Sequence, residues 1–217
     1  MAKRARGRPA QSAVSDDALL EAMLQSFAEN GYDGTSVREI ARRLDVSHNL
    51  IPQRFGSKEK LWYAAVDHGF GRLIKDLTRE AETLGSDELL VLRGLVASCI
   101  EMNALHPSLL QIINQEATQP GPRLDYLFTT YIMPIRDFGD AWIQRLASAG
   151  RMAPVSVTLL YFLITHGAGG MFALPALTSR LGGGVEDMDD ASIRQQAVSA
   201  VNVLFDGLLP RQDQVRV

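Results

Sequence analysis

The chain has 217 residues, enough for one large domain or two smaller ones. Hydrophobic residues make up 46% of it and charged residues 22%, the balance of an ordinary globular protein rather than a disordered one. The formal net charge of −3 argues against a protein that coats nucleic acid without selectivity. Its one cysteine, Cys99, excludes an internal disulfide, and no apolar segment follows the basic start as a secretory signal requires, so we expect a cytoplasmic protein.

Residues 1–12 are expected to form a basic arm, because they are too polar and too marked by glycine and proline to fold alone. Within the arm, Arg6 and Arg8 belong to the tetrapeptide RGRP, which resembles the core of an AT-hook. In that motif an extended backbone lays two arginines along a narrow minor groove of DNA. A solvated tail that binds nothing accounts for the same letters, so both interpretations stay open.

The next segment predicts a helix from Ser15 to Gly31. Ser15 is a suitable N-cap, and Asp16 and Asp17 place negative charge in the first turn, where the helix dipole favours it. A buried face recurs at helical spacing and consists of Leu19, Leu20, Met23, Leu24 and Phe27. We expect this helix to brace the segment that follows it.

Residues 36–58 have the outline of a helix-turn-helix. Ser36 and Glu39 have the spacing of a capping box at the start of the first helix. Asp45 suits a turn, because aspartate tolerates the left-handed backbone region. Ser47 can cap a second helix that runs from His48 to residue 55.

A third helix should begin directly after the second one. Gly56 is a suitable stop, Ser57 a suitable cap, and Lys58 lies in the first turn of a long amphipathic helix. A phosphate at that position would meet both the ammonium group and the free N–H groups of the helix start. Around this motif, the side chains predicted to contact DNA are Arg6, Arg8, Thr35, Ser36, Arg38, Ser47, His48, Asn49, Gln53, Arg54 and Lys58.

The residues from Gly31 to Ala41, together with Val46, Ser47 and the run from Phe55 to Leu61, resemble the N-terminal signature of the tetracycline-repressor (TetR) family of bacterial transcription regulators. One position departs from it: Pro52 stands where the family usually carries a phosphate-contacting tyrosine. Proline removes one amide and crowds the carbonyl four residues back. We therefore predict either a distorted first turn in the second helix, or a helix whose cap is Asn49, so that Pro52 falls in the tolerated first turn.

The rest of the chain also predicts helices, because no segment alternates as a half-buried strand does. The expected fold is all-α with roughly nine helices. Its expected division is an arm at 1–12, a helix-turn-helix domain at 13–60, a helical effector-binding and dimerisation domain at 61–209, and a tail at 210–217. Pro134 should kink its helix. Residues 155–174 are long and apolar enough to suggest a membrane span, but a helix buried by its own domain and a second subunit is the preferred interpretation.

The resemblance implies that the last two long helices pair with their symmetry mates in a homodimer. Small residues on these helices let neighbouring backbones approach closely. The predicted interface consists of Gly167, Gly170, Ile193, Ala197, Ala200, Val201, Leu204 and Leu208. Two reading heads on a two-fold axis imply a palindromic operator in double-stranded DNA.

The resemblance also implies a small-molecule effector in an apolar cavity, although aromatic residues at helical spacing more often belong to a filled core. The candidate ligand-binding residues are Trp62, Phe70, Met102, Asn103, His106, Tyr126, Tyr131, Trp142, Tyr161, Phe162 and His166. The four histidines have no partner at metal-ligand spacing, and there is no nucleophile elbow or phosphate-cradling glycine loop. We therefore expect no enzyme, no metal and no cofactor. A dimeric DNA-binding protein that senses no ligand remains the alternative.

Overall fold

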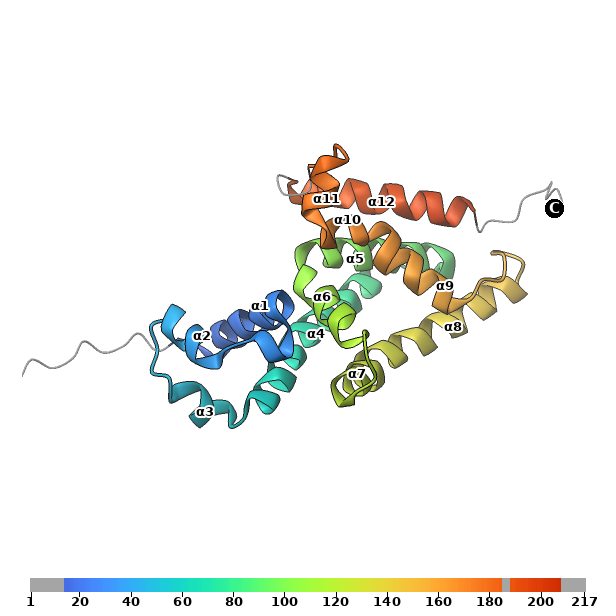
Figure 1. Cartoon of the computed structure of the whole chain (residues 1–217). Coiled ribbons are helices and arrows are strands. Elements are labelled where there is room, and N and C mark those ends of the chain that lie inside the picture. Colours follow the sequence, from blue (N-terminus) through green and yellow to red (C-terminus); the bar gives the residue numbers. More distant parts are fainter. Residues whose placement is uncertain (1–13, 185–187, 208–217) are drawn as a thin grey trace, which may run out of the picture. The chain divides into compact units, whose positions relative to one another are not determined.

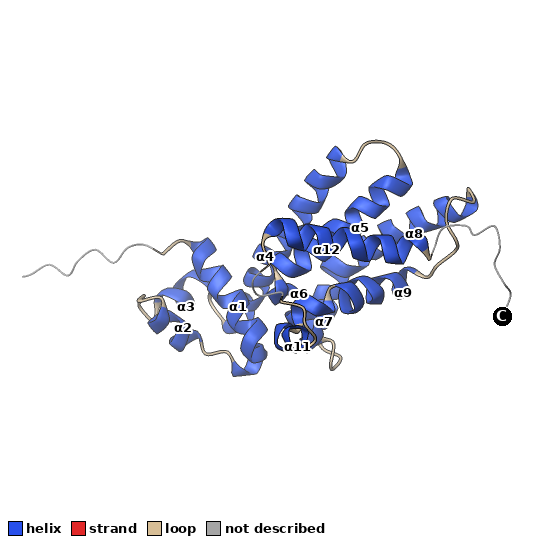
Figure 2. Cartoon of the chain, turned by 90° about the horizontal axis from the view of Figure 1, so that it is seen from above, coloured by secondary structure: helices blue, strands red, loops and turns tan. Residues whose placement is uncertain are grey.

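The computed structural model describes residues 14–184 and 188–207, and every regular element in those ranges is a helix (Figures 1 and 2). The prediction of an all-α fold is confirmed. The chain separates into two compact units, Met1–Gly69 and Phe70–Val217. The division therefore falls nine residues later than the sequence suggested, because the first part of the long helix α4 (Lys58–Thr83) buries Leu61, Trp62 and Val66 in the first unit.

The first unit holds α1 (Asp16–Gly34), α2 (Val37–Arg43), α3 (Leu50–Phe55) and the start of α4. Ser15 caps α1 as predicted, since its hydroxyl accepts a hydrogen bond from the amide of Ala18 at 3.2 Å. Gly31 interrupts the helical geometry with a φ of 70°, so the helix breaks where the sequence indicated, and a last turn then continues to Gly34. The core between these helices consists of Leu19, Met23, Leu24, Phe27, Ile40, Ala41, Ile51, Leu61, Trp62, Ala65 and Val66.

The second unit contains several short helical segments, because some of the expected helices are interrupted by turns or by π-helical stretches. Its segments after α4 are α5 (Glu88–Leu105), α6 (Pro107–Glu116), α7 (Pro122–Leu127), the π-helix η1 (Phe128–Ile132), α8 (Met133–Ser148), α9 (Val157–Phe162), the π-helix η2 (Leu163–Ala168), α10 (Gly170–Ala173), α11 (Pro175–Arg180) and α12 (Asp190–Asp206). Pro134 is the second residue of α8, two positions after the end of η1 at Ile132. A π-helical turn therefore lies just before this proline, and the wider turn accommodates its missing amide.

Helix α12 lies along α5, and the two pack over α8, α9 and α10 (Figures 1 and 2). The core that they enclose consists of Leu92, Val96, Ile100, Ile143, Leu146, Met152, Leu160, Phe172, Ala197, Val201 and Phe205. The guanidinium of Arg93 on α5 lies 5.1 Å from the ring centroid of Phe205 and donates to the side chain of Asn202 at 2.7 Å. These contacts fix which face of α12 meets its own chain.

No single helix of the described residues is long and apolar enough to cross a membrane. One pair, α5 with α6, passes by length and composition but is bent by 88° between its halves. The segment that the sequence offered as a possible span is divided instead into α9, η2 and α10.

Candidate nucleic-acid interface

The start of α2 is capped by Ser36, whose hydroxyl accepts from the amide of Glu39 at 3.4 Å. This is one half of the predicted capping box. The carboxylate of Glu39 pairs with the guanidinium of Arg42, also at 3.4 Å, on the exposed side of the helix. Arg38, Arg42 and Arg43 are all exposed, so α2 presents a cationic face to solvent while Ile40 and Ala41 are buried.

The turn between α2 and α3 is built around Asp45, which has a φ of 51°. The predicted left-handed conformation at this residue is confirmed. Just after it, the amide of Val46 donates to the carbonyl of Ala41 at 2.9 Å, closing the end of α2. This turn sets the angle at which the chain enters α3.

Helix α3 begins at Leu50 with Asn49 as its N-cap, so Pro52 is its third residue. The second of the two arrangements predicted for Pro52 is therefore confirmed: its missing amide falls in the first turn, where an α-helix leaves amides unpaired. Ser47 accepts from the amide of Asn49 at 3.4 Å and stabilises the turn before the helix. The helix is two residues shorter at its start than the sequence indicated.

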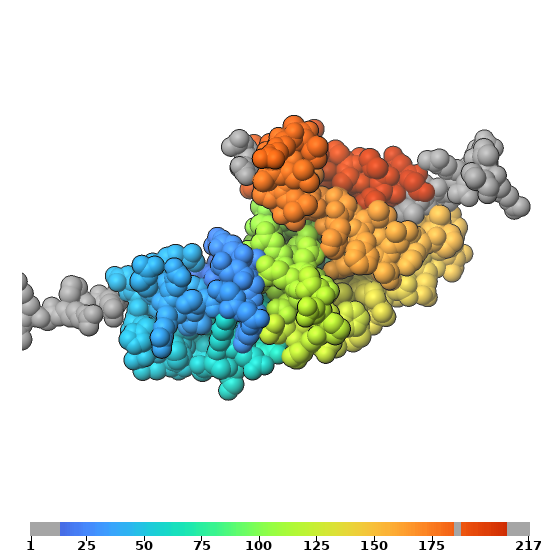
Figure 3. Space-filling model, viewed as in Figure 1, coloured from blue at the N-terminus to red at the C-terminus, as the bar shows by residue number. Residues whose placement is uncertain are grey.

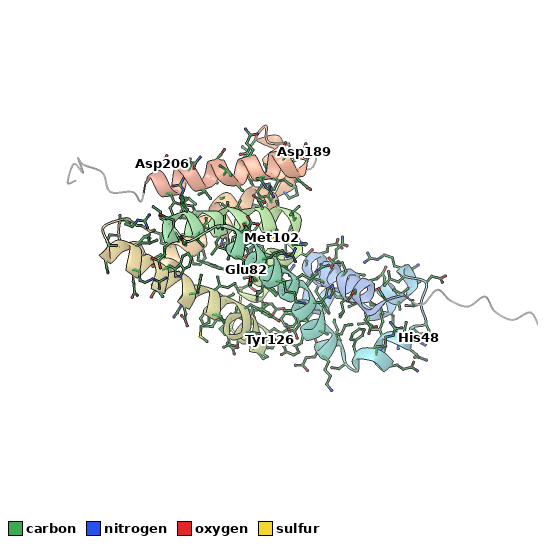
Figure 4. The ribbon with its side chains drawn as sticks, turned by 180° about the vertical axis from the view of Figure 1, so that it is seen from behind. His48, Glu82, Met102, Tyr126, Asp189 and Asp206 are labelled. Carbon is green, nitrogen blue, oxygen red and sulfur yellow. The ribbon has the colours of Figure 1, made fainter. Side chains whose placement is uncertain are left out.

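A shallow cavity of about 280 Å³ lies where α2, α3 and the start of α4 meet. Four of the residues predicted to contact DNA line it, namely Arg38, His48, Asn49 and Lys58, together with Pro52 and Ser57. His48, labelled in Figure 4, is exposed in the turn before α3. Asn49 and Gln53 are exposed as well. This face of the first unit thus presents two amides, an imidazole and two cations, which are the groups that pair with base edges and phosphates.

Lys58 is held in place by the end of α1. Its ammonium donates to the carbonyl of Asp33 at 3.3 Å and lies 4.8 Å from the ring centroid of Tyr32. The ring of Tyr32 is in turn stacked on Phe27, with centroids 5.9 Å apart. Ser57 caps α4 as predicted, accepting from the amide of Lys60 at 3.1 Å.

Two predicted DNA contacts have structural partners instead. Thr35 is only 3% exposed, and its hydroxyl donates to the carbonyls of Ser26 at 3.0 Å and Gly31 at 2.8 Å. The side chain of Thr35 cannot reach DNA, so that prediction was wrong. Arg54 donates to the carbonyl of Val14 at 3.0 Å and to the carboxylate of Asp16 at 2.7 Å, which ties α3 to the start of α1.

The predicted ligand residues do not form one group. Trp62 is 1% exposed and belongs to the core of the first unit, so its assignment to an effector cavity was wrong. In the second unit, Phe70 stacks on Tyr131 at 4.7 Å between centroids, and Tyr126 meets Tyr131 edge to face at 6.2 Å. Met102 on α5 and Tyr126 on α7 lie at separate places in this unit (Figure 4).

The polar candidates concentrate around η2. His166 contacts the hydroxyl of Thr165 at 2.7 Å through Nδ1 and the side-chain oxygen of Asn114 on α6 at 3.0 Å through Nε2. A Cβ at Gly169 would lie 2.8 Å from Nδ2 of the Asn103 side chain, so this side chain lies close to the end of η2. His106 is the residue between α5 and α6. Thr165 is the neighbour of His166 in the sequence, whereas Asn114 lies 52 residues away, so no local spacing indicated a direct contact between Asn114 and His166.

The remaining aromatic candidates border this group and the neighbouring helix. Phe162 lies 5.3 Å from the ring of His166 and 5.5 Å from Tyr161, and it is 54% exposed. Burial raises the pKa of the Tyr161 hydroxyl. Trp142 contacts Phe138 at 4.9 Å. Burial also raises the pKa of the Cys99 thiol to about 11, which keeps it protonated and unreactive at neutral pH.

The predicted dimer stripe was partly wrong. Ala197 and Val201 are 0% and 4% exposed and pack within their own chain, with Ile193, Ala200 and Leu204 beside them. The opposite face of α12 is the open one. Gly167 and Gly170 have no atoms near the position a Cβ would take. Arg6, Arg8 and Leu208 lie outside the described residues. Within the part of the chain that the structure describes, no three His, Cys, Asp or Glu side chains have an arrangement that could hold a metal ion.

Known proteins resemble this chain most clearly in the helices that form this interface. A model of the bacterial regulatory proteins of the tetR family matches residues 19–66. The HTH-type transcriptional repressor Rv3405c of Mycobacterium tuberculosis is 42% identical over 64 residues, 30% of this chain and only 34% of that repressor. The HTH-type transcriptional repressor AcnR of Corynebacterium efficiens is 31% identical over 147 residues, 66% of this chain and 73% of AcnR.

Three solved structures share the fold over most of the chain. The ketosteroid transcriptional regulator KstR2 of Mycobacterium tuberculosis superposes with a TM-score of 0.67 at 20% identity, covering 94% of this chain and 100% of that one. AibR, in complex with isovaleryl coenzyme A and operator DNA, gives 0.67 at 18%, covering 87% and 96%. FadR of Bacillus subtilis, in complex with stearoyl-CoA, gives 0.63 at 16%, covering 87% and 97%.

Proposed function

The chain belongs to the TetR family of bacterial regulatory proteins, and we propose that it is a cytoplasmic transcription repressor that binds a palindromic operator as a dimer and is released by a small, largely apolar ligand. No catalytic step is part of this proposal. The observation that carries it is the polar face of the first unit: Asn49, the N-cap of α3, and Gln53 on α3 are exposed, and Asn49 lines one cavity with Arg38 and Lys58. Side-chain amides read base edges, whereas the cations bind phosphates and set the register.

Selection of bound duplexes from a random pool tests the DNA-binding part of the proposal. We expect an inverted repeat, with half-site centres about one helical turn or a multiple of it apart, because two reading heads related by a two-fold axis meet successive major grooves. No enrichment at low ionic strength would remove DNA binding from the proposal. A single, unrepeated half-site would remove the dimer.

The dimer is supported by apolar side chains that the described residues of one chain leave open. On α9 and η2, Leu159, Phe162 and Leu163 are between 39% and 54% exposed. On α12, Val198 is 46% and Val203 77% exposed. Val203 lies on the side away from the buried Ala197 and Val201, and Val198 lies at the edge of the buried face. Exposed apolar groups on α9, η2 and α12 are typical of an association surface. A Phe162→Glu variant should sediment as a monomer, whereas Leu181→Glu on the 79% exposed residue after α11 should not alter the mass.

A surface elsewhere on the second unit provides that control. Leu174, Leu177 and Leu181 are 57%, 53% and 79% exposed around α11, the orange segment of Figure 3. If Leu181→Glu dissociates the dimer and Phe162→Glu leaves it intact, the interface lies on α11 rather than on α9 and α12.

The ligand response is supported by the polar side chains around η2: Asn114 contacts His166, which lies beside Phe162 and Tyr161, and Asn103 approaches Gly169 at the end of η2. A few polar groups beside aromatic rings are the usual lining of a small-molecule site. AibR and FadR, which share this fold, were solved with acyl-coenzyme A ligands. Helix α4 contributes residues to both units, so it is the element through which a ligand in the second unit would act on the first.

Linkage makes the ligand response measurable. A ligand that binds the DNA-free form more tightly must lower operator affinity by the same factor. Isovaleryl-CoA and stearoyl-CoA are the first probes, and operator binding should weaken as either one saturates the protein. Binding that leaves operator affinity unchanged would contradict release by that ligand.

The alternative is a dimeric DNA-binding protein that senses nothing, its second unit serving only to dimerise. The apolar core closed by α5, α8, α9 and α12 favours it, because those helices already fill the space between them with their own side chains. Calorimetric titration with a broad panel of apolar acids and thioesters distinguishes the two. Heat of binding at a stoichiometry of one ligand per chain supports the repressor with an effector.

A further inference from the structure

We infer that Tyr32 is a positioning residue for DNA binding: its ring holds the ammonium group of Lys58, so that this cation is already in place when a phosphate of the duplex reaches it. The inference rests on the proposed function, in which Lys58 binds phosphate. It gives a role in DNA binding to the last turn of α1, from Tyr32 to Gly34, where none of the predicted DNA contacts lies.

This last turn of α1 follows a break in the helix. Gly31 has a φ of 70° and a ψ of 172°, so the chain leaves the path of the helix there and resumes it for one more turn. A residue with a Cβ rarely adopts a positive φ, which makes glycine suited to this position. The two residues after the break, Tyr32 and Asp33, are the ones that contact Lys58 at the start of α4.

Two different kinds of contact hold the ammonium group of Lys58. It lies 4.8 Å from the centroid of the Tyr32 ring, within the range at which a cation is attracted to an aromatic face. It also donates a hydrogen bond to the carbonyl of Asp33 at 3.3 Å. An ammonium group has three N–H donors, so a single hydrogen bond to Asp33 leaves donors for a phosphate while both contacts persist.

The ring of Tyr32 is itself fixed by the core of the first unit. It stacks on Phe27 with an interplanar angle of 10°, and Phe27 is only 1% exposed. A lysine side chain has a long flexible stem, whose ordering normally opposes binding. Because the ordered ring already restrains Lys58 in the free protein, less conformational entropy is lost when the ammonium group meets a phosphate.

The place of Lys58 makes this restraint relevant to DNA. Lys58 lines the shallow cavity of the first unit together with Arg38, His48 and Asn49, which are predicted DNA contacts on the other elements of the helix-turn-helix. Phosphate contacts set the register in which neighbouring side chains meet the bases. Holding the ammonium group therefore fixes one phosphate contact relative to the side chains that read the sequence.

Lys60 supplies a matched control. It lies two residues after Lys58 in the first part of α4, is exposed and carries the same charge, but the cation beside the Tyr32 ring is Lys58. Replacing either lysine by glutamine removes one positive charge from the same end of the helix. Only the replacement of Lys58 removes the group that Tyr32 is inferred to position.

The decisive experiment is a double-mutant cycle between Tyr32→Leu and Lys58→Gln, measured as affinity for a selected duplex at several salt concentrations. Tyr32→Leu alone should lower the affinity about two- to fivefold for each half-site, the range of an exposed cation–π contact, and flatten the salt dependence toward that of Lys58→Gln. In the Lys58→Gln background, Tyr32→Leu should have no effect beyond about twofold, the margin within which independent sites add. In the Lys60→Gln background it should keep its full effect. Tyr32→Phe, which keeps the ring, should bind as the natural chain does.

Nuclear magnetic resonance of the unaltered chain gives a second measurement, which serves if thermal unfolding shows that Tyr32→Leu does not fold. An aromatic ring shifts the protons above its face upfield. The methylene protons next to Nζ of Lys58 should therefore resonate upfield of the corresponding protons of Lys60. This difference should persist after the duplex is added, because the cation stays beside the ring while it binds the phosphate.

The other outcomes overturn the inference. An equal loss of affinity from Tyr32→Leu with Lys58 present and with Lys58→Gln would mean that the ring supports only the fold. Stronger binding by Tyr32→Leu, or loss of the upfield shift in the complex, would mean that the ring competes with DNA for the ammonium group. A folded Tyr32→Leu variant that binds as the natural chain does would leave the ring no role in binding. Failure of the unaltered chain to bind any duplex would instead remove the proposed function.

Discussion

The two units hold their polar side chains in different ways. In the first unit most polar contacts join residues a few positions apart: Ser15, Ser36 and Ser57 each cap a helix by binding an amide three residues on. In the second unit Asp87 and Asp189 cap their helices in the same local way. The units differ in how far their longest side-chain hydrogen bonds reach. Those of the first unit join Arg54 to Val14 and Asp16 over 40 and 38 residues, whereas in the second unit Arg145 binds Glu88 over 57 residues, Arg151 binds Asp87 over 64 and Arg93 binds Asn202 over 109. The second unit therefore depends more on pairings between distant parts of the sequence.

The largest expected effect comes from removing one large core side chain from each unit, which tests whether the two units are stabilised separately. Trp62→Ala and Phe205→Ala remove residues that are 1% and 0% exposed, and each should cost about 3–5 kcal/mol of stability. We expect calorimetry to resolve two unfolding transitions, with each variant lowering only that of its own unit. Leu181→Ala, at a residue 79% exposed, is the control and should change stability by less than about 0.5 kcal/mol. One transition lowered by both variants would mean that the units unfold together.

A smaller effect tests the local bonding of the first unit. Thr35→Val keeps the shape of the side chain but leaves the carbonyls of Ser26 and Gly31 without its hydroxyl, which should cost about 1–3 kcal/mol. The affinity of the folded protein for DNA should not change, because this hydroxyl does not face solvent. Thr78→Val on the exposed side of α4 is the matched control. Weaker DNA binding by a folded Thr35→Val variant would make Thr35 a DNA contact after all.

The division of labour on the DNA face gives the next prediction. Lys58→Gln should weaken binding to all duplexes alike and flatten the slope of log affinity against log salt by about 0.9, the value for one phosphate. Gln53→Ala should instead change which bases are preferred, at a cost of about 1–3 kcal/mol of discrimination. Repeating the random-pool selection with each variant separates the two. If Lys58→Gln changes the consensus sequence, Lys58 reads bases and its assignment as a phosphate contact is wrong.

The smallest expected effect concerns acid. The amide of Leu90 and the guanidinium of Arg151 hold the pKa of Asp87 below its ordinary value of 3.8. A depressed pKa contributes stability that is present above the unfolded value and lost as the pH falls through the folded value. The free energy of unfolding of the natural chain, measured with urea, should therefore fall below about pH 4. In Asp87→Asn the free energy of unfolding should fall less over the same range. An unaltered acid dependence would mean that other carboxyl groups control it.

A second carboxyl group makes that test specific to the long-range pairing. The hydroxyl and amide of Ser192 likewise lower the pKa of Asp189, which caps α12 within its own turn. Asp189→Asn should also reduce the acid dependence, but it should leave the link from α5 to Arg151 intact. Exchange of amide hydrogens at the start of α5 reports that link directly.

These differences explain which parts of the molecule could be predicted from sequence. The caps at Ser15, Ser36 and Ser57, the left-handed Asp45 and the shifted start of α3 at Asn49 all follow from a residue and its near neighbours. Local geometry decides each of them, so a short window of sequence was sufficient.

The errors arose where distant partners decide the outcome. Ala197 and Val201 form an apolar stripe that suits a second subunit or the same chain equally well, and only the packing of α5 settles the choice. Thr35 is polar and lies beside the helix-turn-helix, but its hydroxyl donates a hydrogen bond to the carbonyl of Ser26, nine residues away. The contact between Asn114 and His166 spans 52 residues, so no local pattern of the sequence indicated it.

The π-helix η2 has a consequence for how the second half of the chain is aligned. A π-helical turn takes in one residue more than an α-helical turn of the same length. Deleting one residue between 163 and 168 should let an ordinary α-helix run on from α9, and everything beyond it would then swing by about 100° around the axis. Phe172, now 8% exposed, would leave the interior, and the near-ultraviolet dichroism of its surroundings would record the change. The number of residues in η2, rather than their side chains, thus sets how α10 is rotated about the helix axis.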